Sequence, residues 1–129
     1  MERYLGCAMV AAMFCGAASA GGPPGGMVLR HCVLFKFKDD APEDRVREIE
    51  QAFCALPEKV DTIYDFEWGK NCSTEGKSEG YTHCFLVTFL SEEGRATYLP
   101  HPAHKEFGKL LGPYLEKVLV LDYWAKVPC

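Results

Sequence analysis

Four strand-like segments and two helical regions, the second in two parts, follow one another along most of the chain, and their order constrains the fold more than any other feature. Strand-like spacing of apolar residues predicts a strand in each of four segments. The four lie at residues 29–37, 62–70, 81–90 and 118–127. Helical spacing predicts one helix that has Pro42 at its first position and ends at Pro57, with its apolar side opposite a charged side that includes Glu50. It also predicts a short helix opened by Ser91 and a longer one over about 102–116.

The order strand, helix, strand, strand, helix, strand is typical of the ferredoxin-like fold, an α+β class written βαββαβ. Right-handed crossovers place the first and third strands in the middle of one antiparallel sheet, with helices on one face only. The 81–90 strand is apolar on both faces, so the face without helices exposes Leu34 and Leu86. We therefore expect a homodimer through this open sheet face, with a barrel-like core between the two subunits, a dimeric α+β barrel.

Composition excludes several other classes of protein. The chain has 129 residues, the length of one domain, and 48% of them are hydrophobic, which is too many for a disordered protein. The formal net charge is −4, and basic residues are scattered among acidic ones, which argues against nucleic acid as the main partner. No apolar stretch reaches the roughly 20 residues that cross a bilayer, so we expect no membrane partner.

Residues 1–26 precede the predicted domain, which covers 27–129. An uncharged small-residue run followed by Ala18-Ser19-Ala20 indicates a secretory leader cleaved after Ala20. The balance of Arg3 by Glu2 is atypical of such a leader, and a poorly defined extension or an upstream start codon remains the alternative. A transit peptide is disfavoured because the segment is not rich in Arg. The protein is secreted if the leader is real and cytoplasmic otherwise.

Cysteine usage does not decide between these compartments. Cleavage leaves five of the seven cysteines, an odd number with wide spacing and no C-x-x-C pair, so neither a disulfide framework nor a zinc ribbon is indicated. Cys32, Cys54 and Cys84 lie in apolar patterns and are predicted to be buried. The domain therefore has the cysteine pattern of a reduced intracellular protein, which conflicts with a leader. We expect no cofactor.

Four motifs carry a resemblance to a known family. They are RHCVLFKFK at 30–38, YDFEWGK at 64–70, GYTH at 80–83 and YLPHPAH at 98–104. Together they resemble the stress-responsive A/B barrel (Dabb) family from about residue 27 to 127. The resemblance implies a dimeric ferredoxin-like barrel, in agreement with the architecture inferred from the pattern of apolar residues.

The same resemblance implies candidate catalytic residues. A plant member of the family is a polyketide cyclase that closes a ring by aldol condensation, and its working Tyr and His match Tyr98 and His104 here. Its pocket histidines match His31 and His83. The cyclase has bulky aromatic residues that shape its pocket. At the matching positions this chain carries a different set of residues, which implies a pocket of different shape and polarity. These residues are Ile49, Glu50, Phe53, Cys54 and Leu115.

Aldol chemistry needs a base that removes a C–H proton and a donor that holds the enolate oxygen, and a neutral His and a Tyr hydroxyl suit these tasks. The expected pocket lies between sheet and helices. Its predicted ligand-binding residues are His31, Val33, Phe35, Phe53, His83, Phe85, His101 and Phe107. The structural alternative is that His31 and His83 are hydrogen-bonded core residues and that His101 opens a helix. The spacing of His101 and His104 is a weak metal signal without a nearby carboxylate or Cys, so no metal site is predicted.

Two functions from different classes follow. One is a dimeric module that binds a small hydrophobic molecule without turnover. The other is a cofactor-free cyclase or lyase with His104 as base and Tyr98 as donor.

Overall fold

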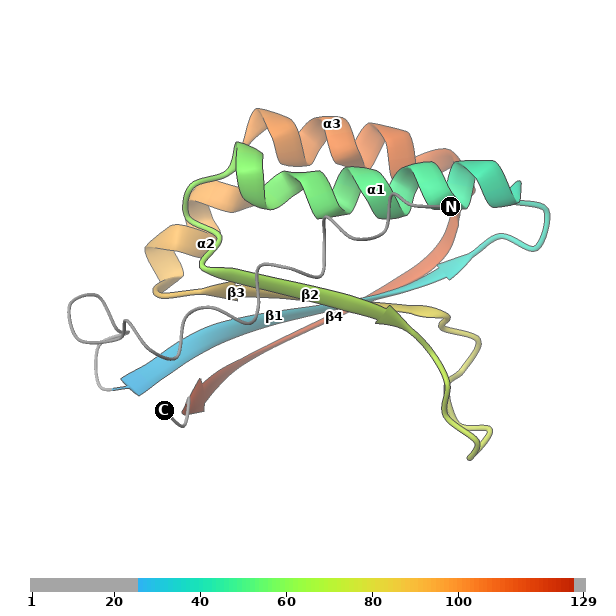
Figure 1. The fold of residues 1–129 in the computed structure, drawn as a ribbon, viewed down its shortest axis with the longest axis horizontal. Coiled ribbons are helices and arrows are strands. Elements are labelled where there is room, and N and C mark those ends of the chain that lie inside the picture. Colours follow the sequence, from blue (N-terminus) through green and yellow to red (C-terminus); the bar gives the residue numbers. More distant parts are fainter. Residues whose placement is uncertain (1–25, 127–129) are drawn as a thin grey trace.

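The computed structural model describes residues 26–126, so the predicted leader, its cleavage after Ala20 and the last residues of the predicted 118–127 strand lie outside the described residues. The helices lie on one side of the sheet (Figure 1). In chain order the elements are β1 (Met27–Phe37), α1 (Glu43–Lys59), β2 (Asp65–Lys70), β3 (His83–Phe89), α2 (Glu92–Tyr98), α3 (Pro102–Leu111), the 3₁₀ turn η3 (Gly112–Tyr114) and β4 (Leu115–Lys126). The predicted ferredoxin-like α+β class is confirmed.

The sheet has four strands in the order β2-β3-β1-β4, and all neighbouring pairs are antiparallel. The prediction that the first and third strands are central is therefore confirmed. In the register, His31 of β1 lies between Val87 of β3 and Asp122 of β4, while His83 pairs with Phe35. These pairings decide which polar side chains meet on the helix-covered face.

Several predicted boundaries are wrong, and proline explains most of them. Pro57 lies inside α1, which continues to Lys59 and closes with the Val60 N–H donating to the Leu56 carbonyl at 2.9 Å. One missing donor in the last turn does not end a helix whose apolar side is packed. Pro42 is the N-cap rather than the first helical residue.

The last helix also differs from the prediction. α3 ends at Leu111 instead of near residue 116, and a short 3₁₀ turn containing Pro113 leads into β4 at Leu115, three residues before the predicted strand. Pro113 lacks the N–H that would continue the α-helical ladder. The short helix α2 begins as predicted, with the Ser91 hydroxyl accepting from the Gly94 N–H at 3.1 Å.

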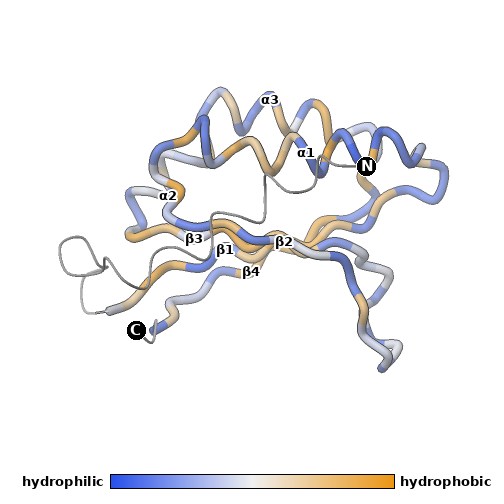
Figure 2. The backbone as a smooth tube through the Cα atoms, viewed as in Figure 1, coloured by the Kyte–Doolittle hydropathy of each residue, from blue (hydrophilic) through white to orange (hydrophobic). Residues whose placement is uncertain are grey.

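The core lies between the helices and the sheet, and apolar segments are concentrated in the strands (Figure 2). Its centre is a group of phenylalanines from different elements. Phe53 of α1 stacks on Phe85 of β3 with ring centroids 4.2 Å apart, and Phe107 of α3 lies 4.8 Å from Phe53. The helical layer is therefore held by aromatic packing on the middle of the sheet.

The opposite face of the sheet carries no helix. Leu34 and Leu86 are half-buried there, and apolar residues of the edge strand β4 are exposed, with Leu121 at 62%. The prediction that the cysteines are buried is wrong within one chain: Cys84 is exposed, and Cys32 and Cys54 are only half-buried. Cys32 and Cys84 lie on this uncovered face, with their Sγ atoms 3.7 Å apart. Burial, together with the hydrogen bond to Cys84, raises the pKa of Cys32 to about 11.

No helix in residues 26–126 is long and apolar enough to cross a membrane.

Candidate functional site

Tyr98 and His104 come together at the junction between α2 and α3. Tyr98 is the last residue of α2, and His104 lies in the first turn of α3. Pro100 and Pro102 turn the chain between them. The two ring centroids are 4.5 Å apart, so the predicted pair shares one site.

His104 has the form of a neutral base. Its Nδ1 lies 2.9 Å from the carbonyl oxygen of Leu99, which only accepts, so Nδ1 carries the proton. This contact leaves the Nε2 lone pair available. Burial lowers the pKa of His104, with a smaller opposing contribution from the Leu99 hydrogen bond. His104 is therefore uncharged at neutral pH and can accept a proton at Nε2.

Tyr98 is suited to donate a hydrogen bond. The side chain is only 1% exposed, and burial raises the pKa of its hydroxyl well above the usual value. Within residues 26–126 its hydroxyl makes no hydrogen bond, so the donor is available to a bound oxygen atom. A phenol held in its protonated form fits an oxyanion donor rather than a base.

His31 of β1 lies next to Tyr98 and is itself hydrogen-bonded to Asp122, which also binds Arg95. Its ring lies 6.0 Å from the Tyr98 ring, edge to face. Its Nδ1 donates to Asp122 of β4 at 2.8 Å, and Arg95 of α2 donates to the other Asp122 oxygen at 2.8 Å. Asp122 and Arg95 are absent from the sequence-based site. The signal for Asp122 is an acidic residue within the otherwise apolar run 118–125.

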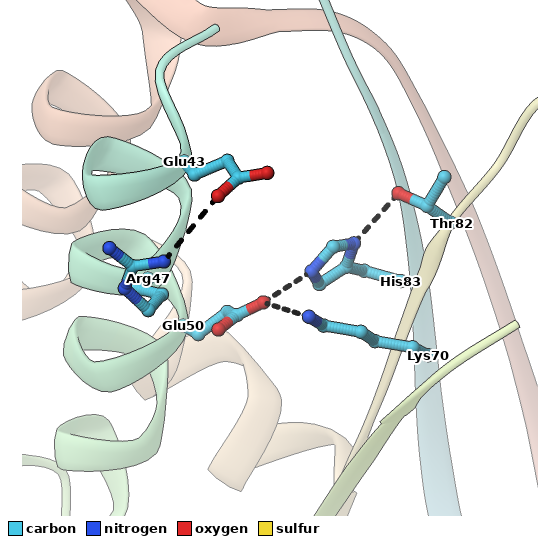
Figure 3. A network of polar contacts seen from close by, with 6 residues as sticks. All are labelled: Glu43, Arg47, Glu50, Lys70, Thr82 and His83. Carbon is cyan, nitrogen blue, oxygen red and sulfur yellow. Dashed lines mark hydrogen bonds and ion pairs between the residues drawn. The ribbon is translucent and has the colours of Figure 1, made fainter. Parts of the chain in front are cut away.

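His83 does not join this site. It pairs with Phe35, four residues along β1 from His31, which separates the two histidines by about 13 Å along the sheet. Figure 3 shows His83 between Glu50 of α1 and Thr82. Its Nε2 lies 2.6 Å from Glu50 and its Nδ1 2.7 Å from the Thr82 hydroxyl.

Glu50 corrects a prediction about α1. The sequence pattern assigns it to the solvent side, but its side chain is 1% exposed and faces the sheet. It belongs to the same helical stripe as Val46, Ile49 and Phe53, and this spacing is the signal that was missed. One carboxylate oxygen contacts His83 and lies 3.5 Å from the Lys70 ammonium, and the other has no partner among the described residues.

The apolar candidates form the packed core described above. Val33, Phe35, Phe53, Phe85 and Phe107 are all buried and contact one another through the phenylalanine cluster. His101 is the N-cap of α3, where its Nδ1 accepts from the Ala103 N–H at 3.0 Å. Ligand contact by these six residues stays a prediction, since their present partners are other protein groups.

Among residues 26–126, two surface hollows lie away from Tyr98 and His104, and neither residue lines them. One of about 390 Å³ lies on the uncovered sheet face beside the loop between β2 and β3. The other, of about 500 Å³, lies between residues 61–64 and the start of α2. Within residues 26–126, no cluster of three or more His, Cys, Asp or Glu side chains could hold a metal ion.

Curated relatives share most of their length with this chain. The stress-response A/B barrel domain-containing protein HS1 of Arabidopsis thaliana is 39% identical, covering 74% of this chain and 87% of that protein. Olivetolic acid cyclase of Cannabis sativa is 37% identical, covering 75% of this chain and 96% of the cyclase.

Solved structures give the same picture. The hydroxynitrile lyase of Passiflora edulis superposes with a TM-score of 0.71 at 25% identity, covering 76% of this chain and 93% of the lyase. A dimeric ferredoxin-like protein of unknown function from Bacteroides fragilis superposes with a TM-score of 0.61 at 31% identity, covering 76% and 95%. The model of the Stress responsive A/B Barrel Domain matches residues 29–125, and the chain belongs to that family.

Proposed function

We propose that the protein is a homodimer whose Tyr98–His104 site binds a small, largely apolar carbonyl compound and moves a proton on it without a cofactor. The observation that carries the proposal is the pairing of a neutral His104, with a free Nε2, and a protonated Tyr98, with a free hydroxyl. A base and an oxyanion donor side by side are what enolate or alkoxide chemistry requires. Two relatives named as a cyclase and a lyase support this class of reaction.

In the proposed reaction the proton that the base removes from the substrate is later returned to the product. His104 Nε2 takes a proton from the substrate carbon next to the carbonyl, and Tyr98 donates a hydrogen bond to the enolate oxygen that forms. The enolate carbon then attacks a second carbonyl, and His104 returns the proton to the new alkoxide. His31 is a positioning residue, because its ring abuts Tyr98 while Asp122 and Arg95 fix its orientation.

The dimer is proposed to form through the uncovered sheet face. On that face the edge strand β4 exposes Leu119, Leu121 and Tyr123, which are between 46% and 62% exposed, and such exposure is unfavourable for an isolated chain. Leu34 and Leu86 extend this apolar surface onto the central strands. Dimeric relatives of the same fold support a second copy as its partner.

Binding without turnover is the second candidate. The near-complete burial of Tyr98 favours it, because very little of the side chain is accessible to a reacting molecule. A module that encloses a hydrophobic ligand among the core phenylalanines needs no such access to a reacting atom.

Product analysis by liquid chromatography tests these candidates on the full chain with two substrates, a linear β-keto thioester and an aromatic cyanohydrin. We expect turnover of one of them, abolished in His104→Gln and slowed about 10²–10³-fold in Tyr98→Phe. Lys105→Gln, one residue along α3 and exposed, is the matched control and should retain full activity.

The pH profile gives an independent readout. Because the pKa of His104 is lowered, the rate should rise with pH below about 6.5 and be level by neutrality. An active His104→Gln protein would refute the catalytic assignment. Absence of turnover in the wild type, with ligand affinity reduced in both variants, would establish the binding module instead.

A further inference from the structure

The loop between β2 and β3 contains the only asparagine of the chain. Asn71 directly follows Lys70, the last residue of β2, and is itself followed by Cys72 and Ser73. Asn-x-Ser, in which x is any residue except proline, is the acceptor sequence for N-linked glycosylation. Such a short motif also occurs by chance, and it can act as an acceptor only in an exposed loop. Its structural context is therefore decisive.

The loop that carries Asn71 is open to solvent. Residues 71–77 are all exposed, and Figure 1 shows the connection between β2 and β3 projecting beyond the strands. β2 is an edge strand, so no further strand encloses the outer side of the base of the loop. The apolar residues of the proposed dimer face lie on β1, β3 and β4, whereas Asn71 lies past the end of β2. A bulky hydrophilic group at this position can extend into water.

The local geometry leaves the reacting nitrogen of Asn71 free. Its side-chain oxygen accepts from the Ser73 N–H at 3.0 Å, and its backbone N–H donates to the Thr82 carbonyl at 2.8 Å. Because a backbone N–H only donates, the oxygen of the amide faces Ser73. Nδ2, the atom to which a glycan is attached, makes no hydrogen bond within residues 26–126.

The turn itself does not require an asparagine. The contact from the Ser73 N–H to the side chain of Asn71 is an Asx turn, and an aspartate carboxylate accepts the same hydrogen bond. The fold therefore uses the oxygen of the Asn71 amide and makes no use of its nitrogen.

The predicted leader supplies the second requirement for glycosylation. Asparagine is glycosylated in the secretory pathway, and the small-residue run that ends at Ala20 is the sequence signal for entry into that pathway. The leader and the acceptor sequence lie in separate parts of the chain, so the two signals are independent of each other. Both indicate the same compartment.

We propose that Asn71 is an N-glycosylation site, which receives an oligosaccharide from a lipid-linked oligosaccharide diphosphate as the chain enters the secretory pathway. Nδ2 of Asn71 forms a bond to the anomeric carbon of the oligosaccharide. The bond from that carbon to the diphosphate oxygen breaks, and the proton lost from Nδ2 ends on the released lipid diphosphate. The transferase of the cell catalyses this step before the dimer assembles. The attached glycan then lies beside the edge strand β2, where it hinders pairing with strands of other molecules.

Production of the full chain, leader included, in cultured mammalian cells tests the proposal. The secreted protein is treated with peptide N-glycosidase in heavy-oxygen water, which converts a glycosylated asparagine into labelled aspartate. We expect the label on the tryptic peptide 71–77, together with an electrophoretic shift that the enzyme removes. Asn71→Asp keeps the acceptor of the Asx turn and should abolish both signals, as should Ser73→Ala. Ser73→Thr should retain both, because threonine also completes the acceptor sequence.

Thr74→Ala is the matched control, because Thr74 is exposed in the same loop and lies one residue beyond the acceptor sequence. It should be glycosylated as the wild type is. A secreted wild-type chain without a glycan on Asn71 would overturn the proposal, and so would a wild-type chain that stays in the cytosol. A shift that persists in Asn71→Asp would place the glycan on another residue and would equally refute it.

Discussion

The buried contact between Glu50 and His83 makes a quantitative prediction about stability. Glu50→Leu removes the carboxylate and leaves the buried His83 Nε2–H without its acceptor at 2.6 Å. His83→Phe keeps an aromatic ring against Trp68 but leaves Glu50 with a single cationic neighbour, Lys70 at 3.5 Å. The double variant removes both polar groups and leaves two apolar side chains in contact.

The expected free energies follow from these contacts. An unsatisfied buried N–H costs about 1–3 kcal/mol, and leaving a buried carboxylate without its hydrogen-bond donor costs about 3–5 kcal/mol. The two single variants should therefore lose about 4–8 kcal/mol in sum. Replacing both partners by apolar groups is often close to neutral, so the double variant should lose at least about 2 kcal/mol less than that sum.

Urea denaturation followed by circular dichroism measures the four free energies of unfolding. Glu48→Gln is the control on the same helix: its ion pair with Arg45 is exposed, and its loss should change stability by less than about 0.5 kcal/mol. Losses that add within about 0.5 kcal/mol would show that the two side chains do not interact, which would contradict the 2.6 Å contact between them.

Four further outcomes are expected. Phe53→Ala should lower the free energy of unfolding by about 3–5 kcal/mol in urea denaturation, because it leaves a cavity in the phenylalanine cluster. Leu86→Glu should convert the dimer to monomers or aggregates in sedimentation velocity, because the interface would bury a charge. Ser91→Ala should cost about 1 kcal/mol in thermal unfolding through loss of the α2 cap, with no loss expected for Ser73→Ala in the exposed loop. Because the folded pKa of His104 is lowered, its contribution to stability is present above about pH 6.5 and is lost as the pH falls, so His104→Gln should flatten that part of a stability–pH curve.

The order of the elements could be predicted from the sequence because each element has its own period. Alternation along β1 and β3 assigned Phe35 and Phe85 to the core face and Leu34 and Leu86 to the other, as the structure has them. The βαββαβ order then left few topologies, and the central position of the two strands followed from the handedness of crossovers. The proximity of Tyr98 and His104 was also expected, since only five residues separate them and two of these are prolines that turn the chain.

Contacts between distant elements were decided only in three dimensions. The period of a strand gives the face of a residue but not its neighbour, so the register alone brought Asp122 to His31 and held His83 about 13 Å away from it. Glu50 shows the same limit on a helix: its charge suggested solvent, whereas the angle of α1 on the sheet buried it beside His83. The sequence by itself therefore determined the layers of the fold and the face on which each strand residue lies. Which polar groups meet was decided by the packing of α1 on the sheet and by the pairing of β1 with β3 and β4. Packing and pairing depend on long-range contacts, which no local sequence pattern encodes.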